Sequence, residues 1–328
     1  MKLGIIGTGT IVQEFLPGLR TLAGLKLQAL LSTPHSLEKA QRLGEAYGIG
    51  TVVDDFASFC QADIDTVYVA VPNSLHYAYC RQAFEHGLHV ICEKPLATNM
   101  REAEELARLA AEKRLFLFEA ITNQHMVTYQ KIREWLPRVG SVKVVQSQYT
   151  QYSRRYDAFK AGDVLPVFDP AKAGGALADL GVYCLHFVLG LFGQPLAYRY
   201  YPNIERGIDT SGLMVLSYPG FQALCLTAKD CKGNAFSIVQ GDKGLIRCDA
   251  PPNTLGKVVL ELNDGTREVF DDGSAAQRQL PEFRDFIRAI DQADYAYGQK
   301  LLAHSLMVCR VQTGARLAAG IRFPSDAG

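Results

Sequence analysis

Apolar residues follow two different patterns along this chain, and the change falls near residue 120. Before it, short and almost continuously apolar runs alternate with stretches in which apolar residues recur at helical spacing. Strands that are apolar throughout lie in sheets covered on both faces, and helices between them are typical of βαβ units. This part predicts a parallel sheet, with one helix ending near Ala23 and others at about 36–47, 74–86 and 99–113. The strand-like runs are LGIIG, KLQALLS, TVYVAVPN, HVICEKP and LFLFEA.

After about residue 140, apolar and polar residues partly alternate, as in strands with one exposed face. Asp264 and Gly265, within NDGT, suit the positive φ angles of a tight turn and predict a hairpin. Two long helices are expected at about 281–292 and 297–319, and 154–177 is interpreted as a long loop. The alternating runs are SVKVVQSQYTQY, SGLMVLSY, FQALCLTAKD and GKVVLELNDGTREVF, which together predict a mostly antiparallel sheet that is open on one face.

Composition narrows the class of protein. With 48% hydrophobic and 21% charged residues, the chain is typical of a globular protein. Lys plus Arg equals Asp plus Glu at 34 each, and this balance favours neither a nucleic acid nor a membrane as partner. No apolar run approaches the roughly 20 residues of a membrane span, and the N-terminus does not resemble a signal peptide. The eight cysteines lack a CxxC pair and the seven histidines form no ligand cluster, so no metal site and a reducing cytoplasm are expected.

The first turn carries a cofactor signal. GIIGTGTIV places Gly7 and Gly9 directly after the first strand, where a dinucleotide-binding turn needs a sharp bend and close approach of backbone to a pyrophosphate. The helix that follows would offer its N–H groups and its positive dipole end to the phosphates. Val12 replaces the third glycine of the usual pattern, a position that mainly affects packing. An ordinary tight turn is the alternative. The predicted cofactor-binding residues here are Gly7, Thr8, Gly9, Thr10 and Ile11.

The end of the second strand bears on which dinucleotide binds. Sites for NAD usually carry an acid there, which bonds the ribose 2′-hydroxyl. Here the segment is LLSTPHSLEK, and Ser32 and Thr33 are neutral donors with no acid before Glu38. A carboxylate would repel a 2′-phosphate and these residues would not, so NADP(H) is expected in preference to NAD(H). No arginine is present in the segment to bind that phosphate.

These signals predict an α/β protein with two domains, which suits a length of 328 residues. Residues 1–121 are expected to form a dinucleotide-binding Rossmann domain. Residues 122–328 are expected to form an α/β domain, with an open, mostly antiparallel sheet, that binds substrate and forms the oligomer interface. An open sheet with an apolar exposed face favours pairing, so a homodimer or homotetramer is expected.

A second informative stretch is GGALADLGVYCLHFVLGLFG at 174–193. If it is helical from about Ala178, then Asp179, Tyr183 and His186 fall at i, i+4 and i+7 on one face. Two interpretations fit three polar groups in an otherwise apolar helix: a buried hydrogen-bond network, or a functional site.

The ordered set of motifs resembles the glucose–fructose oxidoreductase/inositol dehydrogenase (Gfo/Idh/MocA) family. It comprises the glycine turn, VAVPNSLH, GLHVICEKP and GGALADLGVY, and it covers the chain as far as about residue 193. The resemblance implies an NAD(P)-dependent oxidoreductase that interconverts a secondary alcohol and a carbonyl in a sugar, polyol or diol. It implies catalytic roles for Lys94, Tyr183 and Asp179. Many relatives carry His in place of Tyr183, and the Tyr form is similar to the dihydrodiol dehydrogenase branch.

The chemistry of these side chains suits such roles. A free tyrosine has a pKa of about 10 and is a poor base near neutrality. A nearby ammonium such as that of Lys94 would favour the phenolate and could also bond the substrate oxygen. Asp179 would orient Lys94 or the substrate.

Further residues are implied by the same resemblance. Pro72, Asn73 and His76 follow a strand at the carboxyl edge of the sheet and would line the cofactor, with a turn, a helix cap or simple packing as alternatives. Glu93 would reach the nicotinamide ribose or hold Lys94, or form a surface ion pair. For a hydroxylated substrate, the candidates are Tyr152, Asn123 and His186, although the segment around Tyr152 is equally consistent with a solvated strand edge. The alternative function is a non-catalytic dinucleotide or sugar sensor that regulates through protein contacts. A glycoside hydrolase that uses NAD is a third, less favoured one.

Overall fold

The computed structural model describes residues 1–327, and the chain divides into two compact units. The first contains residues 1–120 and 279–306, and the second contains 121–278 and the segment from 307 onward. Each unit has its own sheet and its own apolar core. The contiguous division expected at 121/122 matches the first crossing, but it did not anticipate that the chain returns to the first unit.

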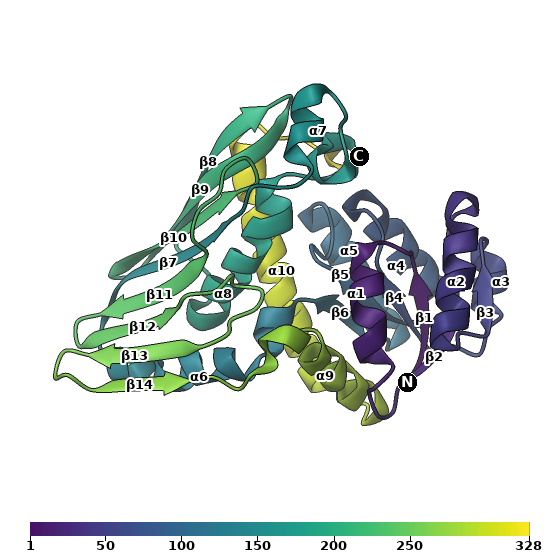
Figure 1. The fold of residues 1–328 in the computed structure, drawn as a ribbon, viewed down its shortest axis with the longest axis horizontal. Coiled ribbons are helices and arrows are strands. Elements are labelled where there is room, and N and C mark those ends of the chain that lie inside the picture. Colours follow the sequence, from purple (N-terminus) through teal and green to yellow (C-terminus); the bar gives the residue numbers. More distant parts are fainter. Residues whose placement is uncertain (328) are drawn as a thin grey trace. The chain divides into compact units, whose positions relative to one another are not determined.

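The sheet of the first unit has six strands, all parallel, in the order β3-β2-β1-β4-β5-β6 (Figure 1). The predicted parallel α/β sheet is thus confirmed. The order reverses between β1 and β4, which is the position where such sheets bind ligands at their carboxyl ends. The strands are β1 (Lys2–Ile6), β2 (Lys26–Leu31), β3 (Thr51–Val53), β4 (Thr66–Val69), β5 (His89–Glu93) and β6 (Leu117–Ala120).

Helices connect these strands at the predicted places. Sequence analysis missed β3 and α3 because they are three and five residues long, too short for a periodic pattern. The connecting helices are α1 (Thr10–Leu19), α2 (Leu37–Tyr47), α3 (Phe56–Cys60), α4 (His76–Glu85) and α5 (Met100–Lys113).

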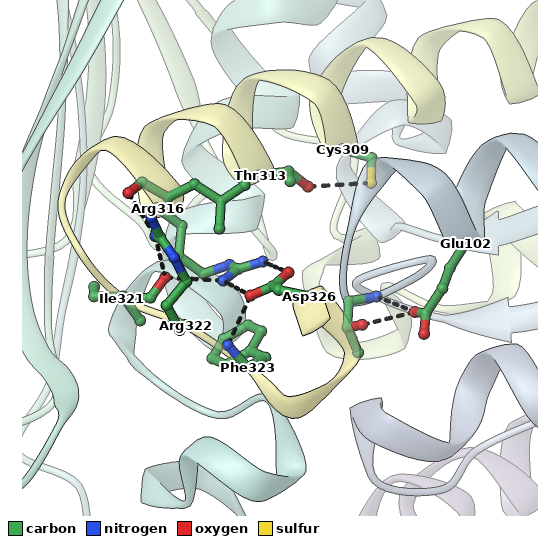
Figure 2. A network of polar contacts seen from close by, with 10 residues as sticks. Glu102, Cys309, Thr313, Arg316, Ile321, Arg322, Phe323 and Asp326 are labelled. Atoms are coloured by element: carbon green, nitrogen blue, oxygen red, sulfur yellow. Dashed lines mark hydrogen bonds and ion pairs between the residues drawn. The ribbon is translucent and has the colours of Figure 1, made fainter. Parts of the chain in front are cut away.

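The start of α5 shows how sequence defines a helix end. The Asn99 side chain accepts a hydrogen bond from the Glu102 N–H at 3.0 Å, as an N-cap does. The Glu102 carboxylate in turn accepts from the N–H and the hydroxyl of Thr98, at 3.2 and 2.6 Å (Figure 2). The arrangement is related to a capping box, with the residue before the N-cap as the donor to Glu102, and it fixes the loop that leads from β5 into α5.

Two late helices complete the core of the first unit: α9 (Leu280–Asp291) and the first half of α10 (Tyr295–Ala318). Phe283 packs edge-on against Tyr68 with ring centroids 5.4 Å apart, and Phe286 stacks on Phe118 at 4.6 Å. Burial of these rings explains why residues 279–306 belong to the first unit, because the sheet face they cover is apolar.

The second unit contains an eight-stranded sheet in the order β14-β13-β12-β11-β7-β10-β9-β8 (Figure 1). Every pair is antiparallel except β7 with β10. This confirms the mostly antiparallel sheet and the hairpin at NDGT, where Gly265 has a φ of +91°. The strands are β7 (Val142–Thr150), β8 (Ala197–Glu205), β9 (Ile208–Tyr218), β10 (Phe221–Ala228), β11 (Phe236–Gly241), β12 (Gly244–Cys248), β13 (Val258–Leu262) and β14 (Arg267–Phe270).

The helices of this unit are α6 (Val127–Trp135), α7 (Tyr156–Ala161) and α8 (Val182–Phe192). The segment 154–177, interpreted above as a long loop, contains α7 and two short 3₁₀ turns. The stretch Pro170–Phe192 is long and apolar enough to cross a membrane by composition alone, but 78% of its apolar 18-residue window is buried inside the protein. It is therefore accounted for as the core helix of the second unit.

Arg316 of α10 anchors the C-terminal segment to the second unit. Its guanidinium forms two hydrogen bonds with the Asp326 carboxylate, at 2.6 and 2.8 Å, and the Phe323 N–H donates to the same carboxylate at 2.7 Å (Figure 2). A bidentate pair of this kind combines charge with fixed geometry. The side chain of Arg316 is almost fully buried, so the pair closes the end of the chain onto the core.

Candidate active site

The turn between β1 and α1 is shaped for close approach of a ligand. Gly7 has a φ of +111°, and a Cβ there would lie 2.3 Å from the Ala70 carbonyl oxygen, so only glycine fits. Gly9 is the N-cap of α1, and a Cβ on Gly9 would meet no atom within 4 Å. Open space at a helix N-terminus suits a pyrophosphate. Thr8 is buried, Thr10 is exposed and Ile11 is half-buried, so the latter two flank the open side.

The end of β2 is neutral. Ser32 is buried and its hydroxyl donates to the Thr33 carbonyl oxygen at 3.1 Å. The Thr33 side chain is exposed, and its hydroxyl donates to Ser36 at 3.3 Å. A 3₁₀ turn, Pro34–Ser36, then leads into α2, whose first acid is Glu38. Hydroxyl groups at the start of a helix are compatible with a phosphate on the 2′-oxygen.

The Glu-Lys-Pro motif begins at the last residue of β5. Glu93 is buried, and its carboxylate accepts a hydrogen bond from the Tyr68 hydroxyl at 2.5 Å. Lys94 is half-buried and directly follows this anchored residue at the carboxyl edge of the sheet. The position of the Lys94 backbone is thus tied to β4 through the bond between Glu93 and Tyr68.

His76 holds the other side of the motif. Its ring nitrogens lie 2.8 Å from the Pro95 carbonyl oxygen and 3.0 Å from that of Val71. Burial lowers the pKa of His76, and the two carbonyl groups oppose that shift. Because the side chain is fully buried by these neighbours, the direct cofactor contact expected of His76 is corrected to a structural link between the motif and the end of β4.

Glu119 of β6 adds a link that sequence analysis missed. Its buried carboxylate accepts a hydrogen bond from the Leu96 N–H at 2.9 Å. The signal was an isolated acid at the end of the apolar run LFLFEA. Pro72 and Asn73 lie between β4 and α4, where Pro72 is exposed and Asn73 is half-buried and starts a short 3₁₀ turn. Their contact with a cofactor stays a prediction.

In the second unit, a buried carboxylate fixes the start of the helix that carries Asp179 and Tyr183. Asp209 accepts hydrogen bonds from the Leu177 N–H and the Tyr200 hydroxyl, both at 2.7 Å. Gly175 has a φ of +107°, and a Cβ there would lie 2.1 Å from the Asp209 carboxylate. Glycine is therefore required for the approach that lets Asp209 cap this helix.

The helix begins with a π-helical turn, Leu177–Gly181, before α8 starts at Val182. A π turn holds more residues than an α turn, so it shifts the side chains that follow around the axis. The side chain of Asp179 is 29% exposed, that of Tyr183 is nearly buried, and His186 is completely buried. Three polar groups were expected on one face of the helix, and only Asp179 and Tyr183 of them remain candidates for the site. His186, expected to contact the substrate, is corrected to a core residue.

Asn123 is also fully buried and supports the helix from behind. Its amide donates to the Tyr183 carbonyl oxygen at 3.0 Å, and the Gln124 amide donates to the His186 carbonyl oxygen at 2.8 Å. These bonds use carbonyl groups of α8 that a substrate would not reach. The substrate contact expected of Asn123 is therefore corrected to positioning of the Tyr183 backbone.

Two further side chains complete the description of this unit. Tyr152 is 41% exposed, and its hydroxyl donates to Asp157 at 2.6 Å and accepts from Lys160 at 2.9 Å, so it remains accessible. Lys229, which sequence analysis missed, directly follows β10, and its ammonium bonds the Asp179 carboxylate at 2.5 Å. Within residues 1–327, no group of three or more His, Cys, Asp or Glu side chains is arranged to hold a metal ion.

The chain is similar in sequence to known proteins. One family model, described as an oxidoreductase family with an NAD-binding Rossmann fold, matches residues 1–120, and the model of the C-terminal domain of the same family matches 129–247. The scyllo-inositol 2-dehydrogenase (NADP(+)) IolU of Bacillus subtilis is 30% identical over 99% of both chains. The trans-1,2-dihydrobenzene-1,2-diol dehydrogenase of Mus musculus is 24% identical, again over 99% of both chains.

A solved structure agrees in fold. The 3-ketoreductase KijD10 from Actinomadura kijaniata, in complex with NADP and TDP-benzene, superposes with a TM-score of 0.81 at 24% identity, over 97% of both chains. The first unit has a parallel sheet whose first strand ends in a glycine turn, and the second unit is built on a large mixed sheet. This is the architecture of a dinucleotide-dependent oxidoreductase. The chain belongs to the Gfo/Idh/MocA oxidoreductase family.

The buried Asp209 gives a prediction for stability. Burial raises the pKa of Asp209 to about 6, against the bonds from Leu177 and Tyr200 that lower it. A raised pKa means that the folded protein binds the proton more tightly than the unfolded chain does. The stabilisation is complete below the unfolded value of about 3.9 and is lost as pH rises through about 6. Between pH 5 and pH 8, wild type should lose about 1.4 kcal/mol more free energy of unfolding than Asp209→Asn.

Urea unfolding of both proteins at the two pH values measures this difference, and all other titrating groups cancel in the comparison. A difference between wild type and Asp209→Asn that stays constant over this range would show that Asp209 has an ordinary pKa in the folded protein.

Proposed function

We propose that this oxidoreductase interconverts a secondary alcohol and a carbonyl in a sugar, polyol or diol. The observation that carries the proposal is the fixed geometry around Lys94, at the carboxyl edge of a dinucleotide-binding sheet. The residue before it is bonded to Tyr68, and the residues after it are bonded to His76 and Glu119. The names of the relatives in inositol and diol chemistry support this substrate class.

The turn formed by Gly7 and Gly9 fits a nicotinamide dinucleotide, because a side chain at Gly7 would collide with backbone and the space in front of Gly9 is open. When bound, such a cofactor supplies the site that accepts or donates a hydride. Thr10 and Ile11 of the first turn of α1 would bind its pyrophosphate through their N–H groups, together with the helix dipole.

Lys94 would stabilise the negative charge on the substrate oxygen, and Tyr183 would transfer the proton. As an alcohol is oxidised, its hydroxyl loses a proton while negative charge develops on the oxygen. The Lys94 ammonium would bond this oxygen and stabilise the charge. The Tyr183 phenolate would take the proton during oxidation, and the Tyr183 hydroxyl would return it during reduction, as general acid–base groups do. Asp179 would orient the substrate hydroxyl, since part of its carboxylate is exposed.

For the cofactor, we infer a preference for NADP(H) over NAD(H). Ser32 and Thr33 place hydroxyl groups, and no carboxylate, at the end of β2. The Bacillus subtilis relative is named for NADP(+), and the Actinomadura kijaniata structure contains NADP. For location, we infer the cytoplasm, because all eight cysteines are free thiols.

The open face of the second sheet suits a second copy of this chain. Tyr201 of β8, Leu213 of β9 and Leu226 of β10 are neighbours across three adjacent strands. Tyr201 is 50% exposed and Leu226 is 37% exposed. A row of apolar side chains on a sheet face is a feature of homo-oligomer interfaces. The proposed assembly is a homodimer or homotetramer.

Removal of the two proposed groups should impair catalysis more than binding. Lys94→Ala and Tyr183→Phe should each lower kcat/KM by about 10²–10⁴-fold, because each removes a group that acts in the transition state. Tyr201→Phe is a matched control and should be neutral, because Tyr201 is an exposed residue of β8 with no proposed catalytic role. NADPH absorbance with sugars, polyols, diols and α-dicarbonyls as substrates measures turnover, and fluorescence titration measures the Kd for NADPH, which should change little.

Near wild-type turnover by Tyr183→Phe would remove that residue from the mechanism. Dinucleotide binding without turnover of any substrate would favour a sensor.

One added negative charge at the end of β2 should reverse the preference for NADPH over NADH. Wild type should show a lower KM for NADPH than for NADH. Thr33→Asp should reverse the order by raising the KM for NADPH at least about tenfold, since a carboxylate repels the 2′-phosphate. Thr33 is exposed, so the substitution should leave stability unchanged, and Thr21→Asp provides a control for added charge elsewhere in the unit. A strong preference of wild type for NADH would contradict the proposal.

Oligomerisation should depend on the open sheet face. Light scattering should give wild type a mass of twice or four times 36.1 kDa. Leu226→Asp should shift the mass toward the monomer, because it places a charge in the apolar row. Val269→Asp is the matched control, since Val269 is 48% exposed on β14 at the far edge of the sheet. A monomeric wild-type protein would rule out this assembly.

A further inference from the structure

Lys229 is a buried cation whose charge the reaction scheme above does not use. The residue follows β10, and its relative exposure is 1%. Its ammonium lies 2.5 Å from the Asp179 carboxylate and 5.0 Å from the centre of the Phe168 ring. Burial of an ammonium is costly unless it is paired. A lysine is therefore retained in the core of this unit at a position where it meets a proposed active-site carboxylate.

The backbone of Lys229 is held independently of its side chain. Its N–H donates to the Thr210 carbonyl oxygen of β9 at 2.8 Å, and its carbonyl oxygen accepts from the Ser153 N–H at 2.9 Å. The ammonium can therefore be removed by substitution while the main-chain bonds on both sides stay in place. The fold thus holds the Lys229 ammonium at one defined position beside Asp179.

The surroundings of the pair are rich in acids. Asp209 of β9, with Tyr200 of β8 bonded to it, interacts electrostatically with Lys229. Asp230, the next residue along the chain, accepts hydrogen bonds from Thr210 and Ser211 at 2.8 and 2.7 Å. Tyr149 of β7 faces Tyr183, with ring centroids 6.2 Å apart. Without Lys229, the carboxylate of Asp179 would add negative charge next to a tyrosine that must ionise.

Asp179 lies in the π turn and Tyr183 lies four positions later in the first turn of α8, so about one helical turn separates the two residues along the axis. A carboxylate at that range disfavours a phenolate, whereas a neutralised ion pair does so far less. We propose that Lys229 is a positioning residue that neutralises and orients Asp179, so that Tyr183 can exchange its proton near neutral pH. The inference rests on the proposed function of Tyr183 as the proton-exchanging group.

The test follows the titration of Tyr183 directly, without requiring turnover. Tyrosinate absorbance near 295 nm is recorded against pH for each protein and for the same protein with Tyr183→Phe, and their difference reports Tyr183 alone. Lys229→Met should move the midpoint of this titration about one to two pH units higher. Lys229→Arg, which keeps the charge, should stay near wild type. Lys229→Met combined with Asp179→Asn should return toward wild type, because both charges are then absent.

Activity provides the second readout. In the holoenzyme, followed in the direction of alcohol oxidation, the acidic limb of the pH profile of kcat/KM should shift to higher pH in Lys229→Met, with a loss of about 10–100-fold at pH 7. In the double variant the position of this limb on the pH axis should return toward wild type, while the maximal rate falls because Asp179 no longer orients the substrate. An unchanged Tyr183 midpoint in Lys229→Met would overturn the proposal and leave a purely structural ion pair. If Lys229→Met does not fold, the double variant and Lys229→Gln decide by the same titration. Failure of the proposed function has a different signature, namely no turnover by wild type while the Tyr183 midpoint still responds to Lys229.

Discussion

Asp209 lies in β9, and its carboxylate accepts hydrogen bonds from the Leu177 N–H and the Tyr200 hydroxyl, so that two strands and the start of a helix share one buried anion. The segment that carries Asp179 and Tyr183 begins at this point. Gly175 permits the approach, and the Gln312 amide adds a bond of 3.0 Å to the Leu177 carbonyl oxygen. Because the helix is apolar along most of its length, burial alone would allow it to rotate or slide. The directional bonds to its first residue and to its carbonyl groups remove that freedom, and this determines where the two functional side chains point.

The first unit solves a similar problem around Lys94 in a different way. Lys94, the proposed functional residue, lies directly after a strand, and hydrogen bonds hold the residues before and after it. Glu93 is tied to Tyr68, Pro95 to His76 and Leu96 to Glu119. All of these partners are buried, and each bond is strengthened by the low dielectric around it. Catalytic side chains lose efficiency when their supports are loose, and in both units the supports are polar groups inside an apolar core.

Much of the fold could be predicted from sequence, because period and turn chemistry are local. The parallel sheet, the long C-terminal helices and the NDGT hairpin are examples. Elements of three to five residues, such as β3 and α3, carry too little periodicity. For the candidate site, short motifs pointed to Lys94, Asp179 and Tyr183, whose catalytic roles stay predictions. His186 was assigned to the substrate because the sequence does not reveal the π turn that precedes α8 and shifts the side chains that follow it. Asn123 lies in the 3₁₀ turn Thr122–His125, and its bond to the Tyr183 carbonyl oxygen is a tertiary contact that no local pattern shows. Lys229 carried a signal of its own, since FQALCLTAKD ends an apolar strand in charge as HVICEKP does. Its partner lies 50 positions earlier, a pairing that only the tertiary structure reveals.

The return of the chain to the first unit has a consequence for biosynthesis. Leu280, Phe283 and Phe286 belong to the core of the nucleotide-binding unit, yet the ribosome adds them only after residues 121–278 have been made. During synthesis one apolar face of the N-terminal sheet therefore stays uncovered until the residues of the second sheet have been made. Such exposed surface is a target for chaperones and for aggregation. The second unit in turn includes the segment from residue 307 onward, with Arg316 and Asp326. Each unit thus needs a segment that is made after most of the other unit, so the final packing of one depends on translation of the other.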